Sequence, residues 1–210
     1  MPLLSAYAPT LPSDDEPKDR FYDILSSTLR SLPPQEKIVL LGDFNARVGK
    51  EHHVWGKVIG RHGVGSCNSN GERLLRLCSE FGLTITNTIS QLRDKFKTTW
   101  MHPRSKHWHL LDYVIVRQSD VRDVLLTRAM RGAECWTDHR LARASLRFQI
   151  RPPHRKSKPK KRLHVDALCC PDTELATATS CKICQTVPKT TAALWTRLPQ
   201  NGKRLSLIHI

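Results

Sequence analysis

The sequence lacks any long hydrophobic run, and its 210 residues are poor in acidic and aromatic side chains. No stretch approaches the roughly 18 consecutive apolar residues of a membrane-spanning helix, so we expect no membrane partner. The first residues contain no basic segment followed by an apolar stretch, and we therefore expect no secretory signal. Hydrophobic residues make up 39% of the chain, which suits one compact domain with a polar tail rather than several domains.

The cysteines are odd in number, at seven, and scattered along the chain. This pattern argues against a disulfide scaffold and for a reducing, intracellular compartment. Four of them could supply zinc thiolates: Cys169, Cys170, Cys181 and Cys184. The first two are adjacent, however, and adjacent cysteines bind one zinc ion poorly, so we do not expect a zinc site.

The charge is asymmetric, because Lys and Arg number 34 whereas Asp and Glu number only 19. Seven basic residues and no acidic residue fall within residues 151–163 (RPPHRKSKPKKRL). Cations interrupted by proline cannot bury themselves, so we predict an exposed linker that contacts phosphates or directs nuclear import. A plain soluble spacer explains the same composition equally well.

The composition divides the chain into three regions. Residues 1–150 carry the periodic apolar pattern of a folded domain, and 151–163 form the basic linker. Residues 164–210 are predicted to be a poorly ordered tail, because Thr, Ala and Cys dominate much of it without any period. The last six residues, LSLIHI, read like a sequencing adapter translated in one frame, and our hypothesis is that this end is an artefact.

Apolar residues recur at helical spacing in residues 18–32 and 70–82, with Asn70 as a suitable N-cap. Residues 37–41 (KIVLL) are apolar beyond the first position, which predicts a strand buried on both faces. The other stretches that read as strands are 3–8, 83–86, 97–101, 110–116, 124–129 and 141–150. Strands and helices mix without strict alternation, which favours an α/β fold with mixed or antiparallel sheets and outer helices.

Three short strings place an acid or an amide at the end of an apolar strand. Asp43 and Asn45 follow residues 37–41, Asp112 lies within the later strand LLDYVIV, and Asp138-His139 precede the last strand. Loops at strand ends can converge on one point of a rigid framework. A buried carboxylate costs several kcal/mol unless it is paired, so we expect Asp112 to have a specific partner, for which His139 is a candidate.

Each string taken alone has a structural explanation. Asp-x-Asn after a strand is a common turn, and Asp138-His139 could be a helix cap or a loop pair. All three strings in this order are less easily explained as turns.

SAYAPT, LLGDFN, LLDYV and TDHR, in this order, resemble the endonuclease/exonuclease/phosphatase superfamily. The resemblance is strongest to the endonuclease domains of LINE-like non-LTR retrotransposons and to the craniofacial development protein 2-like proteins that derive from them. It rests also on NSNGERLLRLCSEFGLTITNT and FKTTWMHPRSKHWHLLDYVIVR, and it covers about residues 3–163.

This resemblance implies a two-layer β-sandwich flanked by helices and Mg²⁺-dependent phosphodiester hydrolysis, with Mn²⁺ as an alternative cation. It implies that Asp43 orients or deprotonates the attacking water and that Asn45 holds this water or a phosphate oxygen. Asp43 and Asp138 would hold the metal. His139 would contact the scissile phosphate, with its ring oriented by Asp112. A further residue, Tyr7, would reach the phosphate from its strand end.

The chain departs from the family in ways that affect this expectation. In the family, half of the sandwich precedes the SAYAPT strand and supplies an early Asn and a metal-binding Glu, whereas this chain begins at that strand. Thr10 also stands where many relatives have Asn. We therefore expect a truncated domain, incomplete at its N-terminus, with exposed sheet edges, weak Mg²⁺ binding and weak or absent activity.

Other candidate groups are weaker. Trp108, Arg104 and Lys106 combine an aromatic ring with cations, as in contacts to nucleic acid, whereas Trp100 on an apolar strand is predicted to be a core residue. The loop histidines His52, His53 and His62 are expected to be solvated rather than to bind metal.

The resulting functional hypothesis is a DNA-nicking endonuclease domain that acts in the nucleus without an organic cofactor. RNA and phosphoinositide substrates remain alternatives within the same fold. A hypothesis of another class is a catalytically dead remnant that acts as a basic nucleic-acid-binding module.

Overall fold

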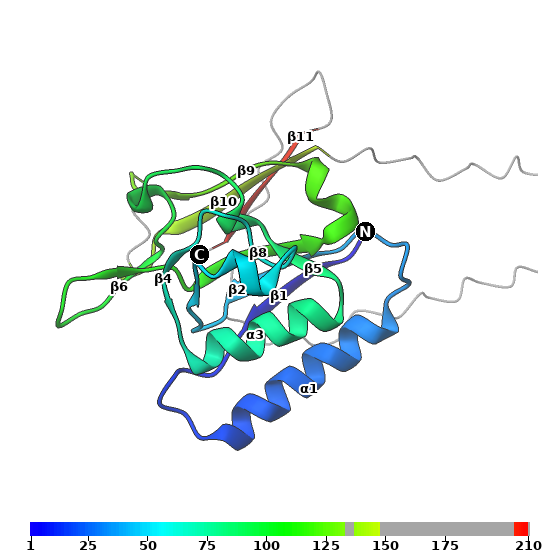
Figure 1. Cartoon of the computed structure of the whole chain (residues 1–210), viewed down its shortest axis with the longest axis horizontal. Coiled ribbons are helices and arrows are strands. Elements are labelled where there is room, and N and C mark those ends of the chain that lie inside the picture. The colour runs from blue at the N-terminus through cyan, green and yellow to red at the C-terminus, as the bar shows by residue number, and fades with distance from the viewer. Residues whose placement is uncertain (133–136, 148–203, 210) are drawn as a thin grey trace, which may run out of the picture. The chain divides into compact units, whose positions relative to one another are not determined.

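A four-stranded sheet lies at the centre of the computed structural model (Figure 1). The structure describes residues 1–132, 137–147 and 204–209, all of which belong to one compact unit. The strand order of this sheet is β1-β2-β8-β5. Its strands are β1 (Leu3–Tyr7), β2 (Val39–Asp43), β8 (Asp112–Arg117) and β5 (Leu83–Ile85). β1 pairs with β2 in parallel, and the other two pairings are antiparallel.

Strand β2 is buried along its whole length, which confirms the prediction of burial on both faces. Its side chains alternate between two hydrophobic clusters. Leu40 belongs to the cluster on the helix-covered face, whereas Val39 and Leu41 belong to the cluster on the opposite face. Apolar side chains at every position of the strand are therefore required, because each face contacts a separate layer.

Helices α1 (Asp15–Ser31) and α3 (Ser69–Glu80) lie beside one another against one face of the central sheet (Figure 1). Buried residues of both, including Leu29 and Leu74, join the same hydrophobic cluster as Leu40. The predicted N-cap of the second helix is wrong by two residues, because the side chain of Asn68, not Asn70, accepts the hydrogen bond from Gly71 N.

A second sheet packs on the other face of the central sheet. Its order is β11-β10-β9, and all its pairings are antiparallel. The strands are β9 (Val124–Met130), β10 (Leu141–Arg147) and β11 (Arg204–His209). Ala144 and Leu146 of β10 contact the cluster that contains Val39 and Leu41. Two sheets thus enclose one core, and the helices cover the outer face of the central sheet.

Smaller elements complete the described residues. Two hairpins are formed by β3 (Val48–Gly49) with β4 (Val64–Cys67) and by β6 (Trp100–Met101) with β7 (Trp108–His109). Short helical turns are α2 (His52–Trp55), η1 (Thr86–Thr88), η2 (Asp94–Phe96) and η3 (Gln118–Asp123). The β6–β7 hairpin projects away from the central sheet (Figure 1).

The expected α/β class, with mixed sheet pairing and helices outside the sheet, is confirmed. The predicted linker 151–163 and the four cysteines considered for zinc lie outside the described residues. Of the predicted tail 164–210, the segment Arg204–His209 forms β11, and the rest lies outside the described part. Within the described residues, no helix has the length and apolar character to cross a membrane.

Candidate active site

Two carboxylates lie side by side where β2 ends and β8 begins. Asp43 and Asp112 are direct partners in the antiparallel register of these strands, and both are buried, at 6% and 2% relative exposure. The strand preceding Asp43 approaches β1 closely, because a Cβ at Gly42 would lie 2.0 Å from the carbonyl oxygen of Ala6. The glycine of the string GDFN is thus required by backbone packing next to the site.

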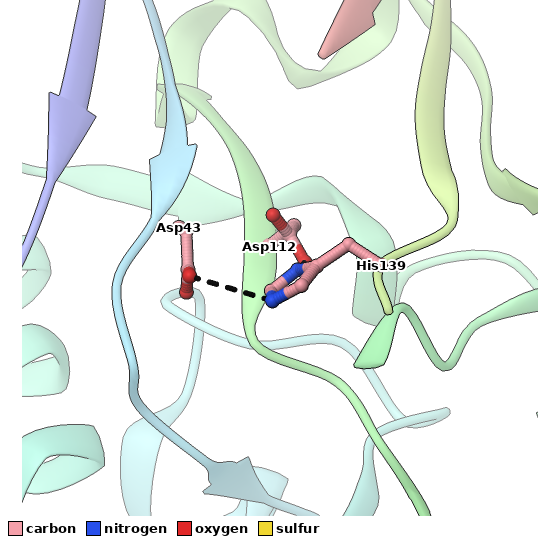
Figure 2. Close-up of side chains that lie close together, drawn as sticks. All are labelled: Asp43, Asp112 and His139. Atoms are coloured by element: carbon pink, nitrogen blue, oxygen red, sulfur yellow. Dashed lines mark hydrogen bonds and ion pairs between the residues drawn. The ribbon is translucent and has the colours of Figure 1, made fainter. Parts of the chain in front are cut away.

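His139 reaches both carboxylates from the loop that precedes β10 (Figure 2). Its Nδ1 lies 2.9 Å from Asp112 Oδ2, and its Nε2 lies 3.8 Å from Asp43 Oδ2. Because a carboxylate accepts hydrogen bonds, the short contact requires a proton on Nδ1. The imidazole is therefore held in one orientation, with Nε2 directed toward Asp43 and the open side of the site.

The site perturbs the acidity of its members. Burial, followed by the charge of Asp112, raises the pKa of Asp43 from 3.8 to about 6, although Asn45 N–H and His139 oppose the change. Burial lowers the pKa of His139, but the hydrogen bond and charge of Asp112, together with Asp43 and Asp138, outweigh burial and raise it. The pKa values of both residues are thus shifted by burial and by charges of the same cluster.

Asn45 lies immediately next to the carboxylates and has an unusual backbone conformation. Its φ is +44°, in the left-handed region, and its backbone N–H donates to Asp43 Oδ1 at 2.9 Å. Its side-chain Nδ2 donates to the carbonyl of Ala8 at 2.9 Å. The residue therefore links the Asp43 carboxylate to the loop that follows β1.

Asp138 lies beside the three clustered residues but makes a different contact. Its Oδ2 accepts a hydrogen bond of 2.6 Å from Trp100 Nε1. Trp100 also forms an antiparallel bridge with His139, and their ring centroids are 6.3 Å apart. The prediction that Trp100 is a core residue is wrong, because the indole is only partly buried and its N–H is used at the site.

Two buried polar side chains fix the backbone around Asp112. The amide of Asn87 donates to Asp112 O at 3.1 Å and accepts from Val114 N at 2.9 Å, as a neighbouring strand would. The hydroxyl of Thr99 accepts from the backbone N–H groups of Leu111 and Asp112. Sequence reasoning missed both residues, because Asn87 lies outside the predicted strands and Thr99 lies in a predicted strand, 97–101, that contains other polar residues.

The remaining candidates lie around the site rather than within it. Tyr7 is the register partner of Asp43 on β1 and is 68% exposed. Arg104 and Lys106 are exposed in the turn of the β6–β7 hairpin. Trp108 of the same hairpin is half-buried, and the Arg140 guanidinium lies 3.2 Å from its ring centroid. The Arg140 guanidinium thus joins the segment that carries His139 to an aromatic ring of the hairpin.

The clustered donor atoms fit a divalent cation. One ligand atom each from Asp43, Asp112 and His139 lies within 4.8 Å of the others, and in the described part of the chain this is the only such group. Two adjacent buried carboxylates repel one another, and a cation relieves that repulsion. Asp112 Oδ2 already contacts His139 Nδ1 at 2.9 Å, whereas Asp43 Oδ2 lies 3.8 Å from Nε2. Neither Asp138 nor the histidines His52, His53 and His62 belong to this group.

The chain is similar in sequence to known proteins. A sequence model of the family described as "Endonuclease-reverse transcriptase" matches residues 3–143. The chain is 32% identical over 157 residues to craniofacial development protein 2 of Bos taurus and 31% identical over 157 residues to that of Tragulus javanicus. Each match covers 75% of this chain, and the chain spans about a quarter (26% and 27%) of the length of these curated relatives.

Solved structures share the fold. One is the endonuclease domain of TRAS1, a telomere-specific non-LTR retrotransposon, with a TM-score of 0.50 and 17% identity over 70% of this chain and 58% of that domain. Another is the 3′ phosphatase NExo from Neisseria bound to product DNA hairpin, with a TM-score of 0.50 and 19% identity over 70% of this chain and 61% of that one. The described chain therefore corresponds to somewhat more than half of each structure.

Proposed function

The chain belongs to the endonuclease-reverse transcriptase family of the endonuclease/exonuclease/phosphatase superfamily, and on this premise we propose that it is a Mg²⁺-dependent phosphodiesterase domain that nicks DNA. The observation that carries the proposal is the arrangement of His139 between Asp112 and Asp43, at 2.9 and 3.8 Å. Phosphate hydrolysis needs a base that activates the attacking water and a donor that stabilises the negative charge on the phosphate. A second carboxylate can supply the base, and an imidazole oriented by the first carboxylate can supply the donor.

Asp43 is the proposed base. A carboxyl whose pKa is raised to about 6 takes up a proton more readily than an ordinary aspartate does, and it is still ionised above neutral pH. Its Oδ1 is occupied by Asn45 N–H, so Oδ2 is the atom that would orient and deprotonate the attacking water. Asn45 would hold this water or a phosphate oxygen through its side-chain amide.

His139 is the proposed contact to the scissile phosphate. Its raised pKa favours the imidazolium, in which Nδ1–H donates to Asp112 and Nε2–H donates to a non-bridging oxygen. Asp112 fixes the orientation of the ring and stabilises its charge. Tyr7 would donate its hydroxyl proton to the same phosphate from the end of β1.

We assign the cation to Asp43, with Asp138 as a second ligand. When bound, Mg²⁺ (or Mn²⁺) would supply positive charge that compensates the negative charge developing on the phosphate oxygens. Trp100 Nε1 would orient Asp138 through its Oδ2 while the other carboxylate oxygen reaches the cation, and with only two carboxylate ligands binding by this chain is expected to be weak.

DNA is the proposed substrate, because the β6–β7 hairpin, whose strand β6 bridges to His139, carries exposed cations, and one solved structure of this fold is bound to a product DNA hairpin. Arg104 and Lys106 would neutralise phosphates, and Trp108 would contact a sugar or base face. RNA and phosphoinositides are the alternatives. We further propose residues 1–150 as a two-layer sandwich, residues 151–163 as a basic linker that favours nuclear import, and the residues after the linker as a tail, apart from Arg204–His209, which forms β11.

The test is nicking of supercoiled plasmid by the full chain with Mg²⁺, with and without EDTA. The proposal predicts nicking that requires the cation, is lost in His139→Ala and is retained in His53→Ala, an exposed histidine outside the cluster. Nicking that persists in His139→Ala would contradict the assignment of the site.

A second candidate is a catalytically inactive module that binds nucleic acid. The observation that favours it is the small ligand set, in which Asp43 alone of the clustered carboxylates is not hydrogen-bonded to His139. Absence of nicking, together with DNA binding that weakens steeply with salt, would support this candidate over the enzyme.

A further inference from the structure

Asn70 is a buried amide on the first turn of α3, only 2% exposed, and it has no part in the chemistry proposed above. Its Nδ2 group donates two hydrogen bonds, one to the carbonyl of Asn45 at 3.0 Å and one to the carbonyl of Pro9 at 3.2 Å. These carbonyls belong to the loops that follow β2 and β1. One side chain therefore links the two loops that directly follow Tyr7, the last residue of β1, and Asp43, the last residue of β2.

The other half of this amide is unpartnered. Asn70 Oδ1 is buried and has no hydrogen-bond partner among the described residues. Leaving a buried oxygen unpaired is costly, and exchanging the amide oxygen and nitrogen would place the oxygen against two carbonyls. The two hydrogen bonds that Nδ2 donates thus determine the orientation of the amide. The unpaired Oδ1 costs free energy, and α3 could form without this cost if another residue stood here.

The packing around Asn70 also indicates that α3 holds the loop after β2. A Cβ at Gly71 would lie 1.8 Å from the carbonyl oxygen of Arg47, so only glycine lets the first turn of α3 approach the loop after β2 this closely. This approach brings Asn70 within reach of Asn45, whose φ of +44° is rare for a residue with a side chain. The bond to its carbonyl holds that peptide in place.

We propose that Asn70 is a positioning residue that acts through Asn45: it holds the left-handed conformation from which Asn45 N–H binds Asp43. This inference rests on the proposed function for its catalytic consequence, but the positioning itself is independent of activity. Without the two donors, the loop after β2 would sample other conformations, and Asp43 would lose the N–H that fixes its Oδ1.

The first measurement is hydrogen exchange, by NMR, in the full chain. In the unmodified protein, the Asn70 side-chain amide protons should exchange at least about tenfold more slowly than those of exposed amides. In Asn70→Leu, which keeps the volume but removes both donors, the Asn45 N–H should exchange about tenfold faster, while amides in the middle of β2 stay protected. Tyr22→Phe is the matched control, because it removes only a 3.4 Å bond to the Asn70 carbonyl.

The second measurement is plasmid nicking by the same variants. A misplaced reacting group lowers the rate constant on the order of 100-fold, so Asn70→Leu should lose kcat to this extent with unchanged affinity for DNA. Adding Asn45→Ala to Asn70→Leu should cause little further loss, because both changes affect one unit.

The outcomes separate the two proposals. If the unmodified chain does not nick DNA, the proposed function fails, and the exchange data still decide whether Asn70 holds the loop. Fast exchange of the Asn70 amide protons in the unmodified protein, or an Asn45 exchange rate in Asn70→Leu equal to that in Tyr22→Phe, would overturn the positioning role. Additive losses of kcat in the double variant would overturn its action through Asn45.

Discussion

The indole Nε1 of Trp100 donates a 2.6 Å hydrogen bond to Asp138 Oδ2. This bond joins the β6–β7 hairpin to the loop that carries His139, and it is reinforced by the antiparallel bridge between Trp100 and His139. The indole thus controls where the Asp138 carboxylate lies and how far it is from a cation at Asp43.

Replacing Trp100 by Phe should therefore reduce nicking more than it reduces stability. The ring volume is largely kept, but the N–H that orients Asp138 is lost, and loss of such a supporting contact typically costs about 10- to 100-fold in metal affinity or activity. Titration of Mg²⁺ against the nicking rate should show the loss. Trp108→Phe, on the same hairpin, should leave the Mg²⁺ dependence unchanged. Equal effects of the two changes would contradict the special role of Trp100.

Asp112→Asn should lower kcat by about 10³- to 10⁴-fold, because an amide no longer stabilises the charged imidazole or selects its tautomer. The two residues form one hydrogen-bonded unit, with 2.9 Å between Nδ1 and Oδ2. Combining Asp112→Asn with His139→Ala should therefore be no worse than His139→Ala alone in single-turnover assays. A multiplied loss in the double variant would mean that Asp112 acts independently of the ring.

Asp43→Asn should abolish nicking and stabilise the fold above neutral pH. The folded-state pKa of Asp43 is raised to about 6 from 3.8, so the folded protein binds the extra proton between these values. The stability contributed by Asp43 therefore falls as the pH rises from about 4 to 6, by up to about 3 kcal/mol. Asparagine keeps the acceptor for Asn45 N–H without the charge.

The measurement is urea unfolding in EDTA at several pH values. The unfolding free energy of Asp43→Asn minus that of the unmodified protein should grow between pH 4 and 7. A difference that is flat, or that shrinks with rising pH, would show that the Asp43 carboxylate is not destabilised by its buried position beside Asp112.

Neutralising the hairpin cations should weaken DNA binding through salt-dependent contacts. Each phosphate contact removed lowers the slope of log K against log salt by about 1. Arg104→Gln and Lys106→Gln, both in the exposed turn, should each have this effect on binding without changing the thermal midpoint. Arg20→Gln, an exposed residue on α1, is the control. Unchanged salt slopes would place the DNA elsewhere.

The central strands could be predicted from the sequence because hydrophobic pattern alone specifies them. An apolar residue at nearly every position of KIVLL has one explanation, burial on both faces, and the structure has two hydrophobic clusters there. Helix boundaries were less predictable. The sequence predicted Asn70 as the N-cap, whereas in the structure Asn68 Oδ1 accepts from both Gly71 N and the distant Arg47 N, a tertiary contact that the helical pattern does not encode.

One contact of the candidate site could be predicted from the sequence, because a buried carboxylate is costly unless a partner group contacts it. Asp112 in an apolar strand required a counter-group, and His139 lies 2.9 Å from it. Supporting residues were not predictable, because their polar groups bind the backbone of distant segments. From the sequence, Thr99 is an ordinary residue of the predicted strand 97–101 and Asn87 lies just after the predicted strand 83–86; only the fold places them against Asp112.

The segment 137–140 and strand β6 share their main-chain bonds, since Met101 N donates to Asp138 O at 3.4 Å and Arg140 N donates to Thr99 O at 2.6 Å. These two segments would therefore have to be exchanged together in a chimera between homologous members of the family. The turn, 102–107, is hydrogen-bonded within the hairpin, but His102 also packs edge-on against Trp100. A chimera that replaced β6 would also have to replace residues 137–140. Otherwise the foreign strand would not match the main-chain hydrogen bonds of this segment, and the His139 imidazole would be displaced.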